Sequence, residues 1–266
     1  TPLAELGGVG VFVAAVREAV LRGEADVAVH SLKDLPTADA PGLRLAAVPA
    51  REDVRDVLVA RDGGTVATLP AGARVGTGSP RRAAQLLALR PDLEVVAVRG
   101  NVDTRLRTVS EGDLDAVVLA HAGLSRLGRL DAATEVLEPA QMLPAPGQGA
   151  LAVECRDVED DAALLDALRD LDDAASRAAV TAERSLLAAL EAGCTAPVGA
   201  HATVSSQDGD VLVHLTGLVV SPDGRTRVRE SVTGPAGDAE AVGRRLASDL
   251  LAAGAPGLLS LNGIAP

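Results

Sequence analysis

The sequence predicts an α/β protein that ends in a smaller α+β unit. Between residues 73 and 126, three short apolar strands each run through a polar loop into a helical pattern. The last third of the chain instead alternates strand patterns with Asp-Gly turn signals and closes on a helix. With 266 residues, the chain is long enough for two or three domains of ordinary size.

The first 60 residues are predicted to form one helix and three strands. Apolar residues recur at helical spacing over 11–21, and a glycine follows shortly after. Alternating apolar residues predict a strand at 26–30, which leads into a loop over 31–36. Two further strands are expected at 43–48 and 56–60.

The strand–helix alternation that follows predicts a parallel, doubly wound layer. Its strands are expected at 73–77, 93–98 and 115–120, and its helices at 81–89, 102–109 and near residue 124. Residues 139–149 are rich in Pro and Gly and are interpreted as a crossover or hinge.

The C-terminal part begins with a strand at 150–155 and a long helical stretch over 161–192, which contains neither Pro nor Gly. A loop over 193–199 follows. A meander of strands and a closing helix complete the prediction, at 201–204, 211–220, 225–233 and 239–252.

The composition excludes several classes of protein. Hydrophobic residues make up 47% of the chain and charged residues 23%, which is typical of a buried core and not of disorder. No apolar run approaches the ~18 residues of a membrane span, and no secretory leader is recognisable. Two cysteines cannot form a disulfide framework, which favours the cytoplasm, and the four histidines share no metal-ligand spacing.

Charge is distributed unevenly, and this pattern indicates the kind of ligand. The net charge of −12 argues against nucleic acid as the main partner. Residues 73–129 nevertheless hold nine arginines against six acids, whereas the rest of the chain carries −15. A local basic region in an acidic protein is typical of a site for a small polyanion.

Three strand–helix junctions in this region carry arginines, over 79–82, 99–105 and 122–126. Ser79 and Asn101 are good helix N-caps. A helix N-terminus with a guanidinium nearby binds carboxylates well. A solvated helix face is the better explanation of any single one of these arginines, but three at matching strand ends favour a shared site for several carboxylates.

Two further positions carry possible chemistry. The chain's single lysine, Lys33, stands beside Asp34 directly after a predicted strand. This pair is either an ordinary surface ion pair or a positioned carboxylate among cations. Cys194 lies in a Gly- and Pro-containing loop, so its thiol is either an accessible nucleophile or attachment point, or incidental. Cys155 lies in an apolar strand and is interpreted as structural.

Together these segments resemble one enzyme family. VAVHSLKDLPT, REDVRDVLV, GTGSPRRAAQL, VRGNVDTRL, LPAPGQGALAVECR and AERSLLAALEAGCTAPVGA occur in the order seen in porphobilinogen deaminases (hydroxymethylbilane synthases). The resemblance runs from residue 2 to about 202. It implies two α/β domains of the type II periplasmic-binding-protein kind and a small α+β C-terminal domain with a three-stranded sheet. Their expected limits are 1–49 with 150–168, then 55–143, then 172–266.

The resemblance also implies an activity and its residues. The family joins four porphobilinogens head to tail into hydroxymethylbilane for tetrapyrrole (heme) biosynthesis, with loss of ammonia, on a dipyrromethane cofactor held by a thioether. By motif match, Cys194 would attach the cofactor and Asp34 would be the catalytic carboxylate that stabilises a cationic intermediate. The cofactor's acetates and propionates would be held by Lys33, Ser31, Ser79, Arg81 and Arg82. The incoming pyrroles would contact Arg99, Arg105, Arg126 and Phe12. A monomer is expected, with no metal.

The chain departs from the family pattern at its beginning. Family members normally begin some dozens of residues earlier, with a strand and a loop that line the same site, so a fragment lacking part of the first sheet is expected. The loop Gly7-Gly8-Val9-Gly10 resembles the family's mobile lid, but Glu5 flanks it and Val9 stands where many relatives carry lysine. Two rival hypotheses are a truncated, inactive relative and a non-enzymatic carboxylate-binding module of the periplasmic type.

Overall fold

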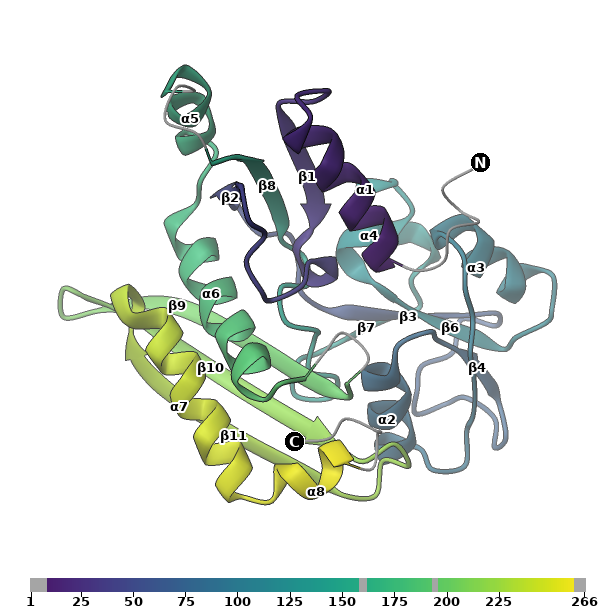
Figure 1. Cartoon of the computed structure of the whole chain (residues 1–266). Coiled ribbons are helices and arrows are strands. Elements are labelled where there is room, and N and C mark those ends of the chain that lie inside the picture. The colour runs from purple at the N-terminus through teal and green to yellow at the C-terminus, as the bar shows by residue number, and fades with distance from the viewer. Residues whose placement is uncertain (1–8, 158–161, 193–195, 261–266) are drawn as a thin grey trace.

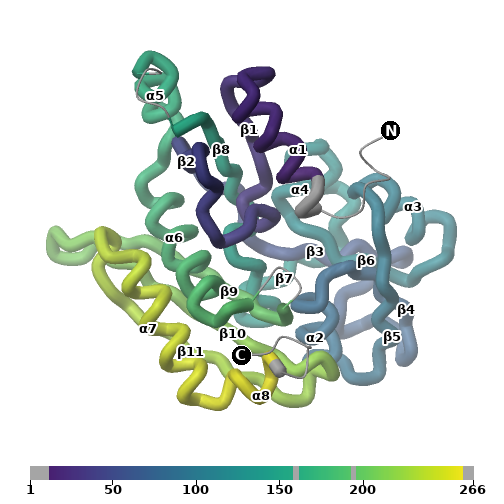
Figure 2. Tube along the Cα trace, viewed as in Figure 1, coloured from purple at the N-terminus to yellow at the C-terminus, as the bar shows by residue number. Residues whose placement is uncertain are grey.

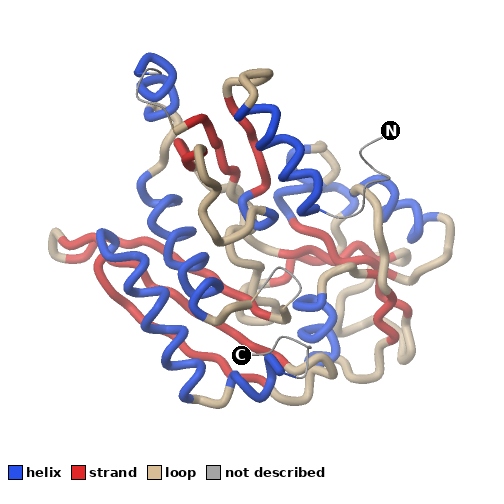
Figure 3. The backbone as a smooth tube through the Cα atoms, viewed as in Figure 1, coloured by secondary structure: helices blue, strands red, loops and turns tan. Residues whose placement is uncertain are grey.

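Within the part of the chain that the structure describes, the strands form three separate sheets (Figure 1). The computed structural model describes residues 9–157, 162–192 and 196–260. Figure 3 shows that helices flank each of the three sheets. The α/β class and the three-stranded C-terminal sheet that the sequence predicts are both confirmed.

The first sheet joins segments from distant parts of the chain. Its order is β1 (Val27–Ser31), β8 (Leu151–Arg156), β2 (Leu43–Ala47), and β8 runs antiparallel to both neighbours. The helix α1 (Val9–Leu21) contacts β1 and β8, and α5 (Ala162–Arg169) contacts β2. Since α1 begins at Val9, two residues of the expected lid loop are helical; Gly7 and Gly8 lie outside the described residues.

The second sheet contains the three predicted parallel strands as neighbours, which confirms that prediction, and two antiparallel strands extend the sheet on one side. Its strands, in spatial order, are β5 (Glu94–Val96), β4 (Arg74–Gly76), β6 (Ala116–Ala120), β3 (Asp56–Ala60) and β7 (Glu135–Leu137). β4 is parallel to β5 and β6, but β3 is antiparallel to both β6 and β7. β3 is buried along its whole length, and a short strand buried on both faces carries no local signal of its direction.

Three helices follow the parallel strands: α2 (Pro80–Leu89), α3 (Val102–Ser110) and α4 (His121–Arg126). Ser79 caps α2 by accepting from the Arg82 amide at 3.4 Å, and Asn101 caps α3 by accepting from the Thr104 amide at 2.9 Å. Both predicted N-caps are therefore confirmed. Because parallel strands end at one edge of a sheet, these helices all begin at that edge.

The predicted continuous helix over 161–192 is wrong, because two acidic residues interrupt it. α5 ends at Arg169, and α6 (Ala174–Ala189) begins after Asp173, whose carboxylate accepts from the Ser176 amide at 2.7 Å. Asp172 accepts from the Val48 amide at 2.7 Å. Aspartate favours such caps over helix interiors, so the Asp-Asp pair ends one helix and starts the next.

The third unit is an antiparallel meander with helices against it. Its sheet order is β11 (Arg227–Pro235), β10 (Asp210–Val220), β9 (Val198–Gln207). α6, α7 (Ala239–Ala252) and α8 (Ala255–Ser260) share one apolar core with these strands. The strand β9 is longer than the predicted 201–204. The predicted limits of α7 are confirmed.

Two crossing segments, residues 48–55 and 138–150, connect the first two sheets, and the third unit holds both of them. Glu183 of α6 is fully buried and accepts from Arg51 at 2.8 and 2.9 Å. The same carboxylate accepts from the backbone amides of Gly147 at 2.7 Å and Ala202 at 2.8 Å. Figure 2 shows α6 running from the side of the first sheet down to the third.

We predict that Glu183→Gln destabilises the protein by about 3 kcal/mol, because it leaves the Arg51 guanidinium buried without a counter-charge. Thermal and urea unfolding followed by circular dichroism measure this change. Glu24→Gln is the matched control, since Glu24 pairs with Arg22 on the exposed surface and exposed pairs contribute little. Equal unfolding midpoints for the two variants would contradict the prediction.

Candidate active site

Lys33 and Asp34 lie on a tight turn at the end of the first strand. β1 ends at Ser31, and the 3-10 turn η2 (Leu32–Asp34) follows directly. Leu32 is fully buried and Leu35 is buried as well, which anchors the turn in the core. Ser31 precedes the turn without capping it through its side chain. The turn leaves Lys33 and Asp34 half-buried and next to each other.

Burial shifts both ionisable groups of this turn toward their neutral forms. It raises the pKa of Asp34, and the positive charges of Lys33 and His30 oppose that rise. It is also the largest cause that lowers the pKa of Lys33; Arg82 adds to this effect, Asp56 and Asp34 oppose it, and the resulting pKa is about 8. Asp34 is thus a carboxylate that can accept a proton more readily than an exposed aspartate.

Arg81 and Arg82 are buried side by side and share one carboxylate. Arg81 is 3% and Arg82 5% exposed, and Asp56 at the start of β3 is fully buried. Asp56 accepts from Arg81 Nη2 at 2.8 Å and from Arg82 Nη2 at 2.7 Å and Nε at 3.1 Å. Burial alone would raise the pKa of Asp56, but the two arginines hold it well below the usual range. Two cations and one anion leave an excess of one positive charge.

The two arginines differ in how many of their side-chain nitrogens have a hydrogen-bond acceptor. Arg82 uses Nη1 on the Val118 carbonyl at 3.1 Å, and its remaining nitrogens on Asp56. Arg81 uses Nη1 on the Leu143 carbonyl at 2.6 Å. Its Nε is buried, and among the described residues and their side chains it finds no acceptor. A buried N–H without an acceptor is costly, so this atom marks a place where a ligand oxygen would be stabilised.

The other three predicted arginines differ in their exposure and in their contacts. Arg105 donates to the Gly100 carbonyl at 2.9 Å, and both burial and the charge of Arg82 lower its pKa, so it belongs to the same cationic group. Arg99 is exposed at the end of the loop after β5. Arg126 donates to the Gly149 carbonyl at 2.8 Å and so contacts a crossing segment.

The remaining predicted residues are placed less directly. Phe12 lies on α1 and is 51% exposed, so its ring is available to pack against a bound ligand. The Ser79 hydroxyl caps α2. Cys194 lies outside the described residues; on either side, Ala192 and Ala196 are buried in the core of the third unit.

Sequence reasoning missed two residues of this site, Asp56 and Gln148. The apolar pattern predicts Asp56 only as the first residue of a strand, although an aspartate in an otherwise apolar strand signals a buried charge. The Pro- and Gly-rich pattern predicts Gln148 only as part of a hinge, although it stands between two glycines. Both are buried, and Gln148 donates to Asp56 at 2.8 Å.

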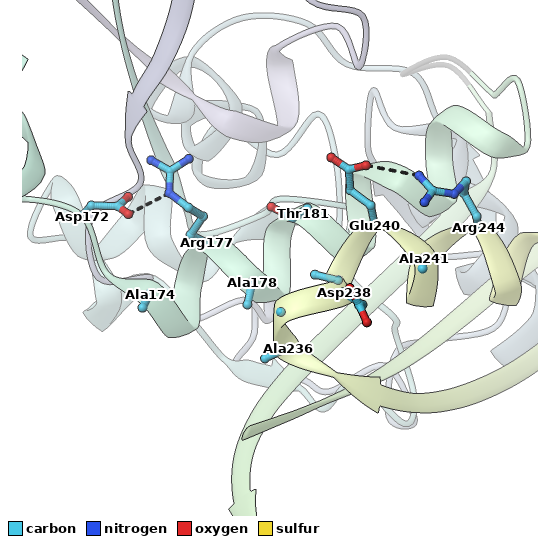
Figure 4. Close-up of a pocket in the computed structure, with 12 residues that line it drawn as sticks. Asp172, Ala174, Arg177, Ala178, Thr181, Ala236, Asp238, Glu240, Ala241 and Arg244 are labelled. Atoms are coloured by element: carbon cyan, nitrogen blue, oxygen red, sulfur yellow. Dashed lines mark hydrogen bonds and ion pairs between the residues drawn. The ribbon is translucent and has the colours of Figure 1, made fainter. Parts of the chain in front are cut away.

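A cavity elsewhere on the molecule contains none of the predicted site residues. It measures about 450 Å³ and lies between α6 and the start of α7 (Figure 4). Its arginines are paired, Arg177 with Asp172 at 2.7 Å and Arg244 with Glu240 at 3.2 Å. Within the described ranges, no group of His, Cys, Asp and Glu side chains could hold a metal ion, and no helix is long and apolar enough to cross a membrane.

Comparison with solved structures gives only distant similarity. A YaeC-family lipoprotein from Enterococcus faecalis is 18% identical with a TM-score of 0.39, covering 59% of this chain and 75% of that one. A putative methionine-binding lipoprotein from Bacillus subtilis is 15% identical with a TM-score of 0.39, covering 59% and 74%.

Comparison with sequence families is decisive. The family model "Porphobilinogen deaminase, dipyromethane cofactor binding domain" matches residues 1–165, and "Porphobilinogen deaminase, C-terminal domain" matches 177–252. "Porphobilinogen deaminase 1" of Streptomyces coelicolor is 58% identical over 97% of this chain and 83% of its own length. Porphobilinogen deaminases of Acidothermus cellulolyticus and Mycobacterium tuberculosis are each 57% identical over 97% of this chain, and over 77% and 84% of their own lengths. These matches show that this chain, in which the buried carboxylate of Asp56 lies among lysine and arginine side chains, belongs to the porphobilinogen deaminase family.

Proposed function

We propose that this chain joins porphobilinogen molecules head to tail into hydroxymethylbilane for tetrapyrrole biosynthesis, releasing one ammonia for each pyrrole added. The observation that carries the proposal is the half-buried carboxyl of Asp34 beside Lys33, whose ammonium is in turn influenced by the charges of Arg81 and Arg82. This arrangement suits a reaction in which an anionic substrate develops positive charge at one point.

The cations account for binding of the substrate. Porphobilinogen carries an acetate and a propionate, so a growing chain of pyrroles is a polyanion. Lys33 offers a half-buried donor and Arg81 a buried one, and Arg105 adds a third cation from α3. Charge-assisted hydrogen bonds to carboxylates are about twice as strong as neutral ones, which makes these side chains suitable anchors.

The residues present also fit the dipyrromethane cofactor of the family. The buried Nε of Arg81 needs an acceptor that a cofactor carboxylate would supply, and the Ser31 hydroxyl next to Lys33 offers another donor. When bound, this group provides the primer on which the chain of pyrroles is built. We assign its thioether attachment to Cys194, and its carboxylates to Lys33, Arg81, Arg82, Ser31 and Ser79.

Asp34 has two tasks in this proposal. In its ionised form it stabilises the positive charge that develops on the incoming pyrrole as ammonia departs, and it accepts a hydrogen bond from the pyrrole N–H. Because burial raises its pKa, it is also able to take up the proton that is released when the new carbon–carbon bond forms. Arg99, Arg105, Arg126 and Phe12 are assigned to the incoming pyrrole.

The organisation of the chain is proposed along the same lines. We assign residues 1–49 with 150–168 to the first domain, 55–143 to the second and 172–266 to the third, which keeps each sheet within one domain. The family resemblance favours a monomer that acts in the cytoplasm without nucleic acid or membrane. Size-exclusion chromatography with light scattering tests the monomer.

Asp34→Asn is expected to lower turnover by about 100-fold or more while a covalent pyrrole adduct is still detected, because the amide cannot carry the stabilising negative charge. Turnover is measured by formation of hydroxymethylbilane, and the adduct by intact mass. Asp39→Asn, an exposed aspartate in the following loop, is the control and should retain turnover. Normal turnover in Asp34→Asn would remove this residue from the catalytic role.

Arg81→Lys is expected to reduce cofactor occupancy by about tenfold, because lysine keeps the charge but lacks the Nε donor. Occupancy is measured as the fraction of purified chain that carries the adduct in intact-mass spectra. The unfolding midpoint is measured in parallel. Arg90→Lys, near the other end of the same helix, should leave occupancy unchanged. Full occupancy in Arg81→Lys would show that the buried Nε does not serve the cofactor.

The denatured wild-type chain is expected to be heavier than its sequence by one dipyrrole, and the extra mass should be absent in Cys194→Ser. Reaction with Ehrlich's reagent identifies the added group as a pyrrole. A non-enzymatic carboxylate-binding module would show the unmodified mass and reversible binding. An adduct that persists in Cys194→Ser would assign the attachment to another residue.

A further inference from the structure

The side-chain amide of Gln148 lies between the cations of the two α/β units. The residue is 1% exposed. Its Oε1 accepts from Lys33 Nζ at 3.2 Å and from Arg82 Nη2 at 3.4 Å. Its Nε2 donates to Asp56 Oδ1 and to the Val54 carbonyl, both at 2.8 Å. Ammonium and guanidinium groups only donate, and carboxylates and carbonyls only accept, so the amide fits in one orientation.

The backbone around Gln148 is fixed independently of its side chain. Gly147 and Gly149 have φ angles of +75° and +87°, and a Cβ on Gly149 would lie 2.4 Å from the Glu52 carbonyl oxygen. Arg51 donates to the Gln148 carbonyl at 2.8 Å, and Glu183 accepts from the Gly147 amide. Changing the side chain therefore leaves the main anchors of this crossing segment in place.

We propose that Gln148 is a positioning residue, which presents the Lys33 ammonium to the carboxylates of the ligand by tying it to the Asp56–Arg82 ion pair of the second sheet. Lys33 lies beside the first sheet, whereas Asp56 and Arg82 belong to β3 and α2. One amide thus makes the cations of two units act as a single site. The inference rests on the function proposed above and deepens it.

The electrostatic surroundings of Lys33 give the expected consequence. The charged groups that act on it are Arg81 and Arg82 from α2, Asp56 from β3, and Asp34 from its own turn. Burial and the two arginines disfavour the ammonium, and the two acids favour it. The Gln148 carbonyl oxygen also favours it, because a hydrogen bond from a charged ammonium is stronger than one from a neutral amine. Removing this acceptor lowers the pKa of Lys33, and replacing it with a carboxylate raises that pKa.

The direction of the effect on binding follows from the sign of this shift. Lys33 is charged below its pKa and loses its charge as the pH rises through about 8. A lower pKa brings this loss to a lower pH. The alkaline limb of cofactor loading and of turnover should therefore move to lower pH when the acceptor is removed.

The test uses the fact that Lys33 is the only lysine of the sequence. Protein labelled with ¹³C-lysine gives one side-chain ε-carbon NMR signal, whose titration reports Lys33 directly. The protein's own groups set the wild-type midpoint near pH 8, and cofactor carboxylates bound beside Lys33 would raise it. Gln148→Met should lower it by about half a pH unit or more, and Gln148→Glu should raise it. A general loss of structure would not move the Lys33 midpoint in opposite directions in the two variants, so opposite shifts indicate positioning. If Gln148→Met does not fold, the direction of the shift in Gln148→Glu alone tests the proposal.

Gln85→Met is the matched control. Gln85 is 3% exposed and binds the other end of the same crossing segment, through the Leu143 amide at 2.7 Å and carbonyl at 3.0 Å. It should leave the Lys33 midpoint unchanged. An unchanged midpoint in both Gln148 variants, or an equal shift in Gln85→Met, overturns the proposal. The titration requires no turnover, so an inactive wild-type chain would contradict the proposed function and still leave this inference open to test.

Discussion

The carboxylate of Asp56 is the constraint on which the site depends. Two neighbouring arginines lie buried in the first turn of α2, where the helix dipole adds further positive charge. Without a counter-charge, neither guanidinium could remain buried at an acceptable free energy. One shared carboxylate makes the arrangement stable and still leaves one cation in excess. Asp56 therefore holds the arginines in place without cancelling their attraction for an anionic ligand.

The reversed strand β3 explains how Asp56 reaches this position. β3 runs antiparallel to β6, so its first residue, Asp56, pairs with Ala120, the last residue of β6. The start of β3 thus lies at the edge of the sheet where the parallel strands end and α2 begins. In a purely parallel sheet, the first residue of this strand would lie at the opposite edge. The antiparallel strand that extends the predicted parallel layer therefore completes the cationic site.

The sequence predicted the elements of the fold, and the parallel arrangement of β4, β5 and β6, better than the contacts between distant residues. The helix α7, the N-caps Ser79 and Asn101, and the strand β3 were placed correctly, because caps and apolar periodicity are local signals. The break at Asp172 and Asp173 was missed because Ala and Leu dominate that stretch. Asp56 and Gln148 were missed because their role depends on partners that are distant in sequence. The pairing of Gln148 with Lys33 spans 115 residues and exists only in the folded chain.

The single lysine at this site has a physical consequence that an arginine would not have. A guanidinium stays protonated at every physiological pH, whereas a buried ammonium has a pKa that its neighbours can move into that range. Lys33 combines burial, two arginines that disfavour its charge, and three acceptors or acids that restore it. Its charge therefore responds to small changes in the groups around it, and a ligand carboxylate that arrives beside it strengthens that charge. Binding and protonation of Lys33 thus reinforce each other, which the arginines of the same site cannot do.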